Sequence, residues 1–164
     1  MRFRLFEQKD FGKTDGYCAY EGGEGLIYPP EFWESHESYR RRLAQFPEGC
    51  WACVNDKDEV LGYMFCHPWD DTFVPLDCRT LEIPKNPTCL YLHDIAVIPA
   101  WRRKGIATTF IDMAKQIAQK HGFPKLKGVS VLGSLPHWQK CGFVAVSEIP
   151  YGENHTGTII ELLI

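Results

Sequence analysis

The sequence predicts an α/β (α+β) protein whose mixed, mostly antiparallel central sheet of about seven strands is flanked by about four helices. Short apolar segments typical of strands recur along most of the chain, and segments with helical spacing lie between them. A single strand–helix–strand unit near the middle requires a parallel crossover. With 164 residues and 45% hydrophobic content, residues 1–164 are expected to form a single domain.

The first third of the chain begins with a strand over residues 2–7. Gly-rich residues 10–28 follow, where we expect one short helix and a loop. After Pro30, apolar and aromatic side chains are spaced by four, three, four and three residues, which places them on one face of a helix. Pro30 suits the first turn of this helix, and Pro47 and Gly49 are expected to end it.

The middle of the chain is expected to form a hairpin and then a buried strand. Residues 50–55 and 59–67 predict two strands joined by a tight turn. Residues 68–88 contain four prolines and no clear periodicity, and so long a loop is usually functional or disordered. Residues 89–98 form a nearly continuous apolar run, as expected of a central strand covered on both faces.

The last third predicts a long helix, a strand, a short helix and two strands. Apolar side chains share one side of a helix after Gly105, and Gly122 suits its C-terminal cap. Residues 125–133 predict a strand. Residues 134–142 predict a short helix with Ser134 as its N-terminal cap. The chain closes with two strands that we expect to be antiparallel, residues 143–149 and 156–164.

Charge, hydropathy and cysteine count give no support for a nucleic-acid partner, a membrane span or secretion. The formal charge of −3 gives no reason to expect nucleic acid or an anionic membrane as a partner. No apolar run approaches the roughly 20 residues that a membrane span needs. The apolar part of the first ten residues is too short for a signal peptide. Seven cysteines are an odd number, which favours reduced thiols, and we therefore expect a cytoplasmic protein.

Cys50 and Cys53 have the spacing of a redox or zinc site, which works on a turn or at a helix start. Here the pair lies in a predicted strand, and residues three apart on a strand point to opposite faces. We therefore expect small buried side chains rather than a redox pair, and no metal site.

Three positive charges run directly into the long helix, at Arg102, Arg103 and Lys104, and Gly105 follows them. The first N–H groups of a helix have no internal partner, and the helix dipole adds positive potential there. Basic residues at this end oppose the dipole, and an anionic ligand removes the conflict. Gly105 and the small Ala107 leave room for a phosphate to approach the backbone.

These residues match the pattern [Q/R]-x-x-G-x-[G/A] over 102–107, and a second motif, an aromatic residue, three further residues and then Gly-Phe, spans 138–143. Together they resemble the GCN5-related N-acetyltransferase (GNAT) superfamily, most strongly over residues 90–143. The resemblance implies that the turn holds the pyrophosphate of acetyl-CoA and that the pantetheine follows the central strand. The implied cofactor-binding residues are Ile95, Ala96, Val97, Arg102, Arg103, Lys104, Gly105, Ile106, Ala107, Thr108, Ser134 and Trp138.

The resemblance also implies direct transfer of an acetyl group from the thioester to a primary amine of a small molecule or peptide, by a monomer or homodimer. Backbone N–H groups of residues 95–97, near a bulge, would stabilise the oxyanion. The alternative is a non-catalytic acyl-CoA-binding sensor or scaffold domain.

The candidate catalytic residues are His93, Asp94 and Trp138. An alkyl amine is protonated at neutral pH, and an imidazole suits the base that deprotonates it, which favours His93. A structural histidine and a contact to the acceptor are the alternatives for His93. Asp94 is the second candidate for the base and is expected on the opposite face of a regular strand. Trp138 stands where many members of the family carry an acidic tyrosine. His137 next to it could donate a proton instead, and the favoured alternative for His137 is an exposed helix histidine.

The acceptor is expected to enter opposite the cofactor, near three segments, residues 28–37, 67–77 and 151–155. Four acidic residues could attract a cationic amine: Glu31, Glu34, Asp70 and Asp71. Three aromatic residues could line the acceptor pocket: Trp33, Trp69 and Phe73.

Overall fold

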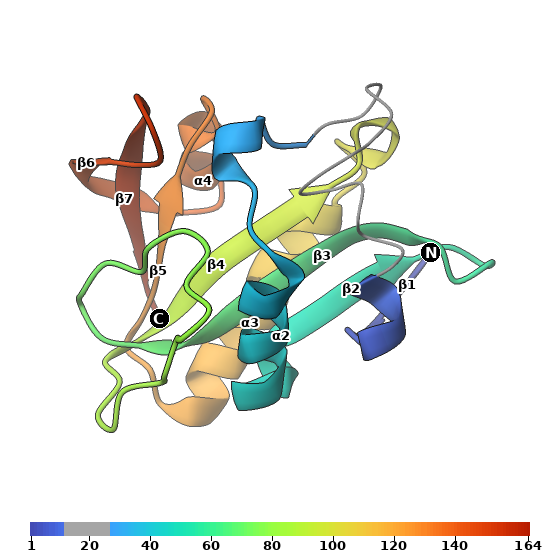
Figure 1. Ribbon diagram of the computed structural model, residues 1–164, viewed down its shortest axis with the longest axis horizontal. Helices are drawn as coiled ribbons and strands as arrows, with labels where there is room; N and C mark the ends of the chain where they lie inside the picture. Colours follow the sequence, from blue (N-terminus) through green and yellow to red (C-terminus); the bar gives the residue numbers. More distant parts are fainter. Residues whose placement is uncertain (12–26) are drawn as a thin grey trace.

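The computed structural model describes residues 1–11 and 27–164, and these form a seven-stranded sheet in the order β1-β2-β3-β4-β5-β7-β6 (Figure 1). All neighbouring strands are antiparallel except β4 and β5. This confirms the predicted mixed sheet with one parallel crossover. The strands are β1 (Arg2–Leu5), β2 (Cys50–Val54), β3 (Val60–Trp69), β4 (Cys89–Val97), β5 (Lys125–Ser130), β6 (Val144–Pro150) and β7 (Thr156–Leu163).

The sheet is covered on both faces, with α2 (His36–Gln45) in front of it and α3 (Ile106–His121) behind it in the view of Figure 1. The short α4 (Leu135–Lys140) follows β5. The described part of the chain holds these three α-helices and several 3-10 turns, which corrects the expected number of about four. The short helix expected within residues 10–28 falls almost wholly outside the described residues.

The helix that was predicted from Pro30 begins later in the structure. Pro30–Phe32 forms a 3-10 turn instead, and the α-helix starts at His36. Ser35 caps this helix, because its Oγ accepts a hydrogen bond from the backbone N–H of Ser38 at 3.3 Å. The extended backbone at the cap therefore separates the turn from α2.

Both ends of α3 are as the sequence predicts. Gly105 and Gly122 flank the helix with φ angles of 83° and 72°, in the left-handed region that favours glycine. The buried face of α3 packs against β3 and β4 through the side chains of Ile106, Phe110, Ile111, Ala114, Ile117 and Ala118.

Strand β4 is the fourth of the seven strands, which confirms its predicted central position. Its pairing with β3 shifts at one point: Asp94 lies opposite Phe65, whereas Leu92 lies opposite Cys66. His93 is therefore an extra residue, and the strand carries a β-bulge there.

The bulge changes which side chains share a face. Leu92 and Ile95 belong to the core beneath α3, whereas His93 and Asp94 both contact side chains on the α2 side. The expectation that His93 and Asp94 point to opposite faces is wrong, because it assumed the two-residue period of a regular strand.

Strands β4 and β5 separate beyond the bulge. Their pairing covers only residues 90–92 of β4 and 126–128 of β5. Val129 and Ser130 continue β5 but pair with β7. The edge of β4 over residues 95–97 therefore has no β5 partner, which leaves a gap in the middle of the sheet.

The long loop between β3 and β4 is fastened to α2. Arg41 Nε and Gln45 Nε2 donate to the carbonyl oxygen of Leu81 at 2.7 and 2.5 Å. The backbone N–H of Ile83 donates to Gln45 Oε1 at 2.8 Å. Leu81 itself is buried, so this loop is packed against the domain.

The two cysteines of β2 do not form a pair. Cys53 packs in the core beneath α3, whereas Cys50 packs in the cluster on the α2 side. Burial raises the pKa of both thiols, which disfavours the reactive thiolate. Within residues 1–11 and 27–164, no group of three or more potential metal-ligating side chains comes together, and no helix is long and apolar enough to cross a bilayer.

Candidate active site

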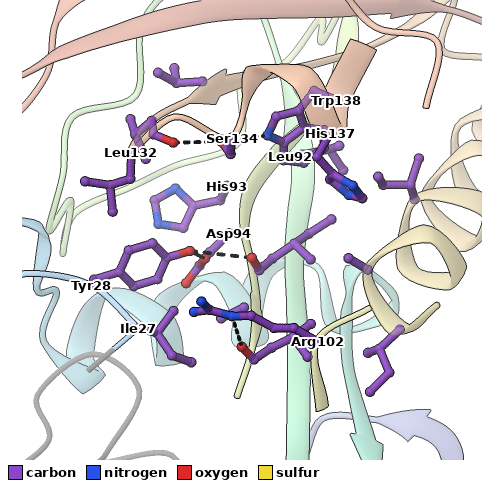
Figure 2. A pocket seen from close by; sticks show the side chains of 18 of the residues that line it. Ile27, Tyr28, Leu92, His93, Asp94, Arg102, Leu132, Ser134, His137 and Trp138 are labelled. Carbon is purple, nitrogen blue, oxygen red and sulfur yellow. Dashed lines mark hydrogen bonds between the residues drawn. The ribbon is translucent and has the colours of Figure 1, made fainter. Parts of the chain in front are cut away.

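A pocket of about 740 Å³ extends from the start of α3, along β4, to α4. Figure 2 shows Arg102 at one side of it, Ser134, His137 and Trp138 at the other, and Tyr28, His93 and Asp94 between them. The pocket brings together nearly all of the site residues that the sequence predicts. Those that line it are His93, Asp94, Ile95, Ala96, Val97, Arg102, Arg103, Gly105, Ile106, Ala107, Thr108, Ser134 and Trp138.

The N-terminus of α3 forms one wall of the pocket and is suited to an anion. Gly105 is its N-cap and supplies no side-chain cap, and the first turn contains no acidic residue. A Cβ atom placed on Gly105 would meet nothing within 4 Å. Space beside Gly105 is therefore open, and the helix dipole favours negative charge at the first-turn N–H groups, which have no partner within the helix.

The basic residues before this helix differ in what they contact. Arg102 Nε donates to the carbonyl oxygen of Val97 at 3.2 Å, which holds its side chain against the end of β4. Arg103 has a positive φ of 61° and lines the pocket. Lys104 is not among the pocket residues, and its Nζ lies 4.3 Å from the centre of the Trp101 ring. The structure thus gives Lys104 a cation–π contact.

At the other side of the pocket, the hydroxyl of Ser134 is fully used. It donates to the carbonyl oxygen of Val131 at 2.7 Å, and it accepts from Trp138 Nε1 at 3.2 Å. Ser130 Oγ lies 3.0 Å away and supplies the second donor. Ser134 occupies the N-cap position but its side chain makes no capping bond, which corrects the predicted role of Ser134 in α4.

Trp138 presents an apolar ring to the pocket. The ring packs edge-on against Phe143, with ring centres 5.1 Å apart. Its N–H is bonded to Ser134, and an indole is a donor with no useful acidity. Trp138 can therefore shape this end of the pocket, but it cannot supply the proton that a tyrosine would.

The imidazole of His93 is held between Arg42 and Glu34. Arg42 Nη2 lies 3.2 Å from Nδ1, and a guanidinium can only donate, so Nδ1 accepts this hydrogen bond. Nε2 therefore carries the proton and donates to Glu34 Oε2 at 2.5 Å. The His93 side chain is 3% exposed. Both ring nitrogens are thus engaged by the protein, which fits a positioning role better than direct contact with substrate.

Glu34 is a buried carboxylate with several donors. Besides His93, it accepts from Ser38 Oγ at 3.0 Å and from the backbone N–H of Asp77 at 2.8 Å. Burial opposes its charged form, but the interaction with His93 and the charge of Arg42 lower its pKa to about 2. Glu34 is therefore ionised at neutral pH, and through Asp77 it ties the long loop to the pocket.

Asp94 is enclosed by three tyrosines from three segments. Tyr28 Oη donates to Oδ1 at 2.6 Å, and Tyr39 and Tyr63 each donate to Oδ2 at 2.8 Å. Burial raises the pKa of Asp94, while the three hydrogen bonds favour its charged form. Tyr28 Oη also lies 3.5 Å from the carbonyl oxygen of Ile95, so it stands beside the open stretch of β4.

The acidic residues proposed to attract an amine are mostly paired elsewhere. Glu31 Oε1 lies 2.6 Å from His155 Nε2, Asp71 accepts from Lys125 at 2.7 Å, and Asp70 caps the turn at Thr72. Only Glu34 of the four lines the pocket.

The aromatic residues proposed for the acceptor side, Trp33, Trp69 and Phe73, are not among the residues that line the pocket. Six other apolar or aromatic residues line this side: Ile27, Tyr28, Phe32, Tyr39, Leu76 and Tyr151.

Sequence reasoning did not single out Arg42 or the three tyrosines, although Tyr28 lies in the segment 28–37 that was expected near the acceptor. Arg42 follows Tyr39 by three residues on α2, so the helical spacing placed it on the buried face. That was a usable signal, since a buried arginine requires an acidic partner. The convergence of Tyr28 and Tyr63 on Asp94 had no signal in local sequence.

Fold and site together define a class of protein: an α/β domain with a split central sheet, a helix start suited to an anion, and a pocket that reaches buried carboxylates. A family model described as the acetyltransferase (GNAT) family matches residues 20–143. The chain belongs to this family, which confirms the predicted resemblance. The residues at the start of α3 and along β4 fit its cofactor, acetyl-CoA. No curated protein matches the sequence.

Solved structures show the same fold at low sequence identity. The loading GNATL domain of CurA from Lyngbya majuscula is similar with a TM-score of 0.82 and 14% identity, covering 99% of this chain and 96% of that chain. The NatC complex bound to Gag peptide and CoA is similar with a TM-score of 0.75 and 16% identity, covering 99% and 98%. The GphF GNAT-like decarboxylase with isobutyryl-CoA is similar with a TM-score of 0.76 and 16% identity, covering 99% and 99%. Because one neighbour is a decarboxylase, the fold alone does not define the reaction.

Proposed function

We propose that this protein is an acetyl-CoA-dependent N-acetyltransferase that acts on a primary amine of a small molecule or a peptide. The observation that carries the proposal is the continuity of one pocket from the open N-terminus of α3 to the carboxylates beside the β4 bulge. An anionic cofactor and a cationic amine would meet within it at the unpaired stretch of β4, residues 95–97.

In this proposal, the start of α3 holds the pyrophosphate through the N–H groups that follow Gly105, and Arg102 and Arg103 add positive potential. The unpaired edge of β4 binds the pantetheine and offers backbone N–H groups to the developing oxyanion. Acetyl-CoA supplies an activated acyl group on a good leaving thiolate. Trp138 packs against the end of the pocket where the thioester would lie.

The acceptor would bind between the apolar residues on the α2 side and the carboxylates. Glu34 is ionised and Asp94 accepts three hydrogen bonds, so this end of the pocket favours a cation. For His93, the predicted role of base remains a prediction. Its two engaged nitrogens support the alternative, in which it holds Glu34 and Arg42 in place.

A second candidate function is the non-catalytic acyl-CoA-binding domain, which Trp138 favours because it removes the usual acid. The test combines two measurements on the full chain. Thiol release from acetyl-CoA is followed with tyramine, benzylamine, spermidine and a short peptide with a free N-terminus, and CoA is titrated calorimetrically. Turnover of any amine supports the transferase, whereas CoA binding without turnover supports the sensor. Absence of CoA binding contradicts both.

A further inference from the structure

Tyr28 places a phenol at the reaction end of the pocket, on a segment outside the two family motifs. It lines the pocket, its Oη donates to Asp94 Oδ1 at 2.6 Å, and the carbonyl oxygen of Ile95 is 3.5 Å away. Figure 2 shows the hydroxyl directed at Asp94 and β4. Trp138 offers no acidic proton in this pocket. Tyr28 therefore supplies the titratable hydroxyl that Trp138 lacks, from a different element.

We propose that Tyr28 is a catalytic residue that, with Asp94 as its partner, takes a proton from the acceptor amine and returns one to the leaving thiolate. This rests on the proposed transferase function. Neither residue could act in this way if β4 were regular, because the bulge at His93 is what brings Asp94 onto the face that Tyr28 reaches.

The other two tyrosines orient Asp94 toward Tyr28. Tyr39 and Tyr63 both donate to Oδ2, so they fix the carboxylate and hold Oδ1 toward Tyr28. A carboxylate with one oxygen anchored and the other on a pocket hydroxyl is arranged for proton exchange through that hydroxyl. Burial raises the pKa of Asp94, which makes it a better proton acceptor than an exposed aspartate.

The proton balance can be written for each group. Tyr28 Oη accepts a proton from the acceptor ammonium while its own proton passes to Asp94 Oδ1, and the amine gains a free electron pair. A C–N bond then forms to the thioester carbon and the C–S bond breaks. Nitrogen loses a second proton as the amide forms. One of the two protons returns through Tyr28 to the thiolate sulfur, and the other leaves to water.

Other titratable or charged groups surround this pair. His93 adjoins Asp94 on β4, Arg42 and Glu34 approach from the α2 side, and Tyr151 faces the pocket from the loop after β6. Arg42 is hydrogen-bonded to His93 and to Ser38. The positive charge of Arg42 is therefore directed at Glu34 and His93. The charged form of Asp94 is stabilised instead by hydrogen bonds from tyrosine hydroxyl groups.

The matched test compares Tyr28→Phe with Tyr63→Phe. Both variants remove one phenol donor from Asp94, but Tyr63 is buried and is not among the pocket residues. We expect Tyr28→Phe to lower kcat about 100-fold with the best amine of the panel and to leave the Kd for CoA unchanged. Tyr63→Phe keeps the pocket phenol and leaves Tyr39 to anchor Oδ2, so it should lower kcat by no more than about 10-fold. Equal losses in the two variants would overturn the proposal in favour of a structural cluster.

A second measurement keeps the hydroxyl and changes only its acidity. Difluorotyrosine at position 28 lowers the pKa of the phenol, so the alkaline limb of the kcat profile should move to lower pH. The same substitution at position 63 should not move it. An unmoved limb at position 28 overturns the role of Tyr28. If the native protein acetylates no amine of the panel, the proposed function fails and the role of Tyr28 fails with it, whereas an active Tyr28→Phe overturns only the latter.

Discussion

At the N-terminus of α3 the pocket wall is mostly main chain, whereas at the bulge of β4 it consists of buried ionisable side chains from distant segments. Gly105 contributes a backbone conformation and open space. Glu34, His93 and Asp94 contribute charge and hydrogen bonds that depend on one another. The main-chain wall at α3 can bind a phosphate with few constraints on sequence. The side-chain wall at the bulge can be specific to one acceptor.

The largest expected effect comes from blocking the main-chain wall of the pocket, which is the N-terminus of α3. Gly105→Glu adds a side chain and a negative charge where the N–H groups are free, so the Kd for CoA should rise at least about 100-fold, or 2.7 kcal/mol, by calorimetry. Gly122→Glu is the control, because Gly122 has the same left-handed backbone and open surroundings at the other end of α3. Normal CoA binding by Gly105→Glu would contradict the phosphate assignment.

The next effect concerns charge on the side-chain wall of the pocket, which is formed by Glu34, His93 and Asp94. The folded-state pKa of Glu34, about 2, is below its unfolded value. The ionised carboxylate therefore stabilises the folded protein above about pH 4.5, and this contribution is lost as pH falls toward 2. Glu34→Gln should remove about 2 kcal/mol of this acid-dependent stability. Urea unfolding of the native protein and of Glu34→Gln, each at pH 7 and at pH 3, measures this difference in the free energy of unfolding.

The control for that measurement is Glu31→Gln. Glu31 also has a lowered pKa, from backbone hydrogen bonding and from His155, but it is a solvent-exposed group. Its substitution should leave the pH dependence nearly unchanged. A native-like pH dependence in Glu34→Gln would show that the ionised Glu34 does not hold this wall together.

A smaller effect separates two roles of His93. Gln at this position keeps an N–H donor for Glu34 but cannot titrate. If His93 only positions its neighbours, His93→Gln should lower kcat about 10-fold and leave the acidic limb of the pH profile in place. Loss of that limb together with a fall of 100-fold or more would assign the base to His93 instead.

The two walls also differ in how far the sequence predicts them. The turn, the cap glycine and the helix start at α3 were predictable because they depend on neighbouring residues, although Lys104 packs on Trp101 instead of lining the pocket. The side-chain wall depends on the one-residue bulge at His93, and on Tyr28 and Tyr63, which are 66 and 31 residues from Asp94 in sequence. Periodicity could not show the bulge, because an inserted residue leaves the apolar run unbroken.

The smallest expected effect tests whether the site lacks an acid at all. Trp138→Tyr restores a phenol where many relatives have one, and the ring can keep its contact with Phe143. The leaving thiol has a pKa of about 8.5, so it departs readily without a strong acid. If Tyr28 already delivers the proton, kcat should change by less than about threefold in steady-state assays at pH 7. A rise of about 10-fold or more would mean that the proton is missing from the native site, and that Tyr28 does not supply it.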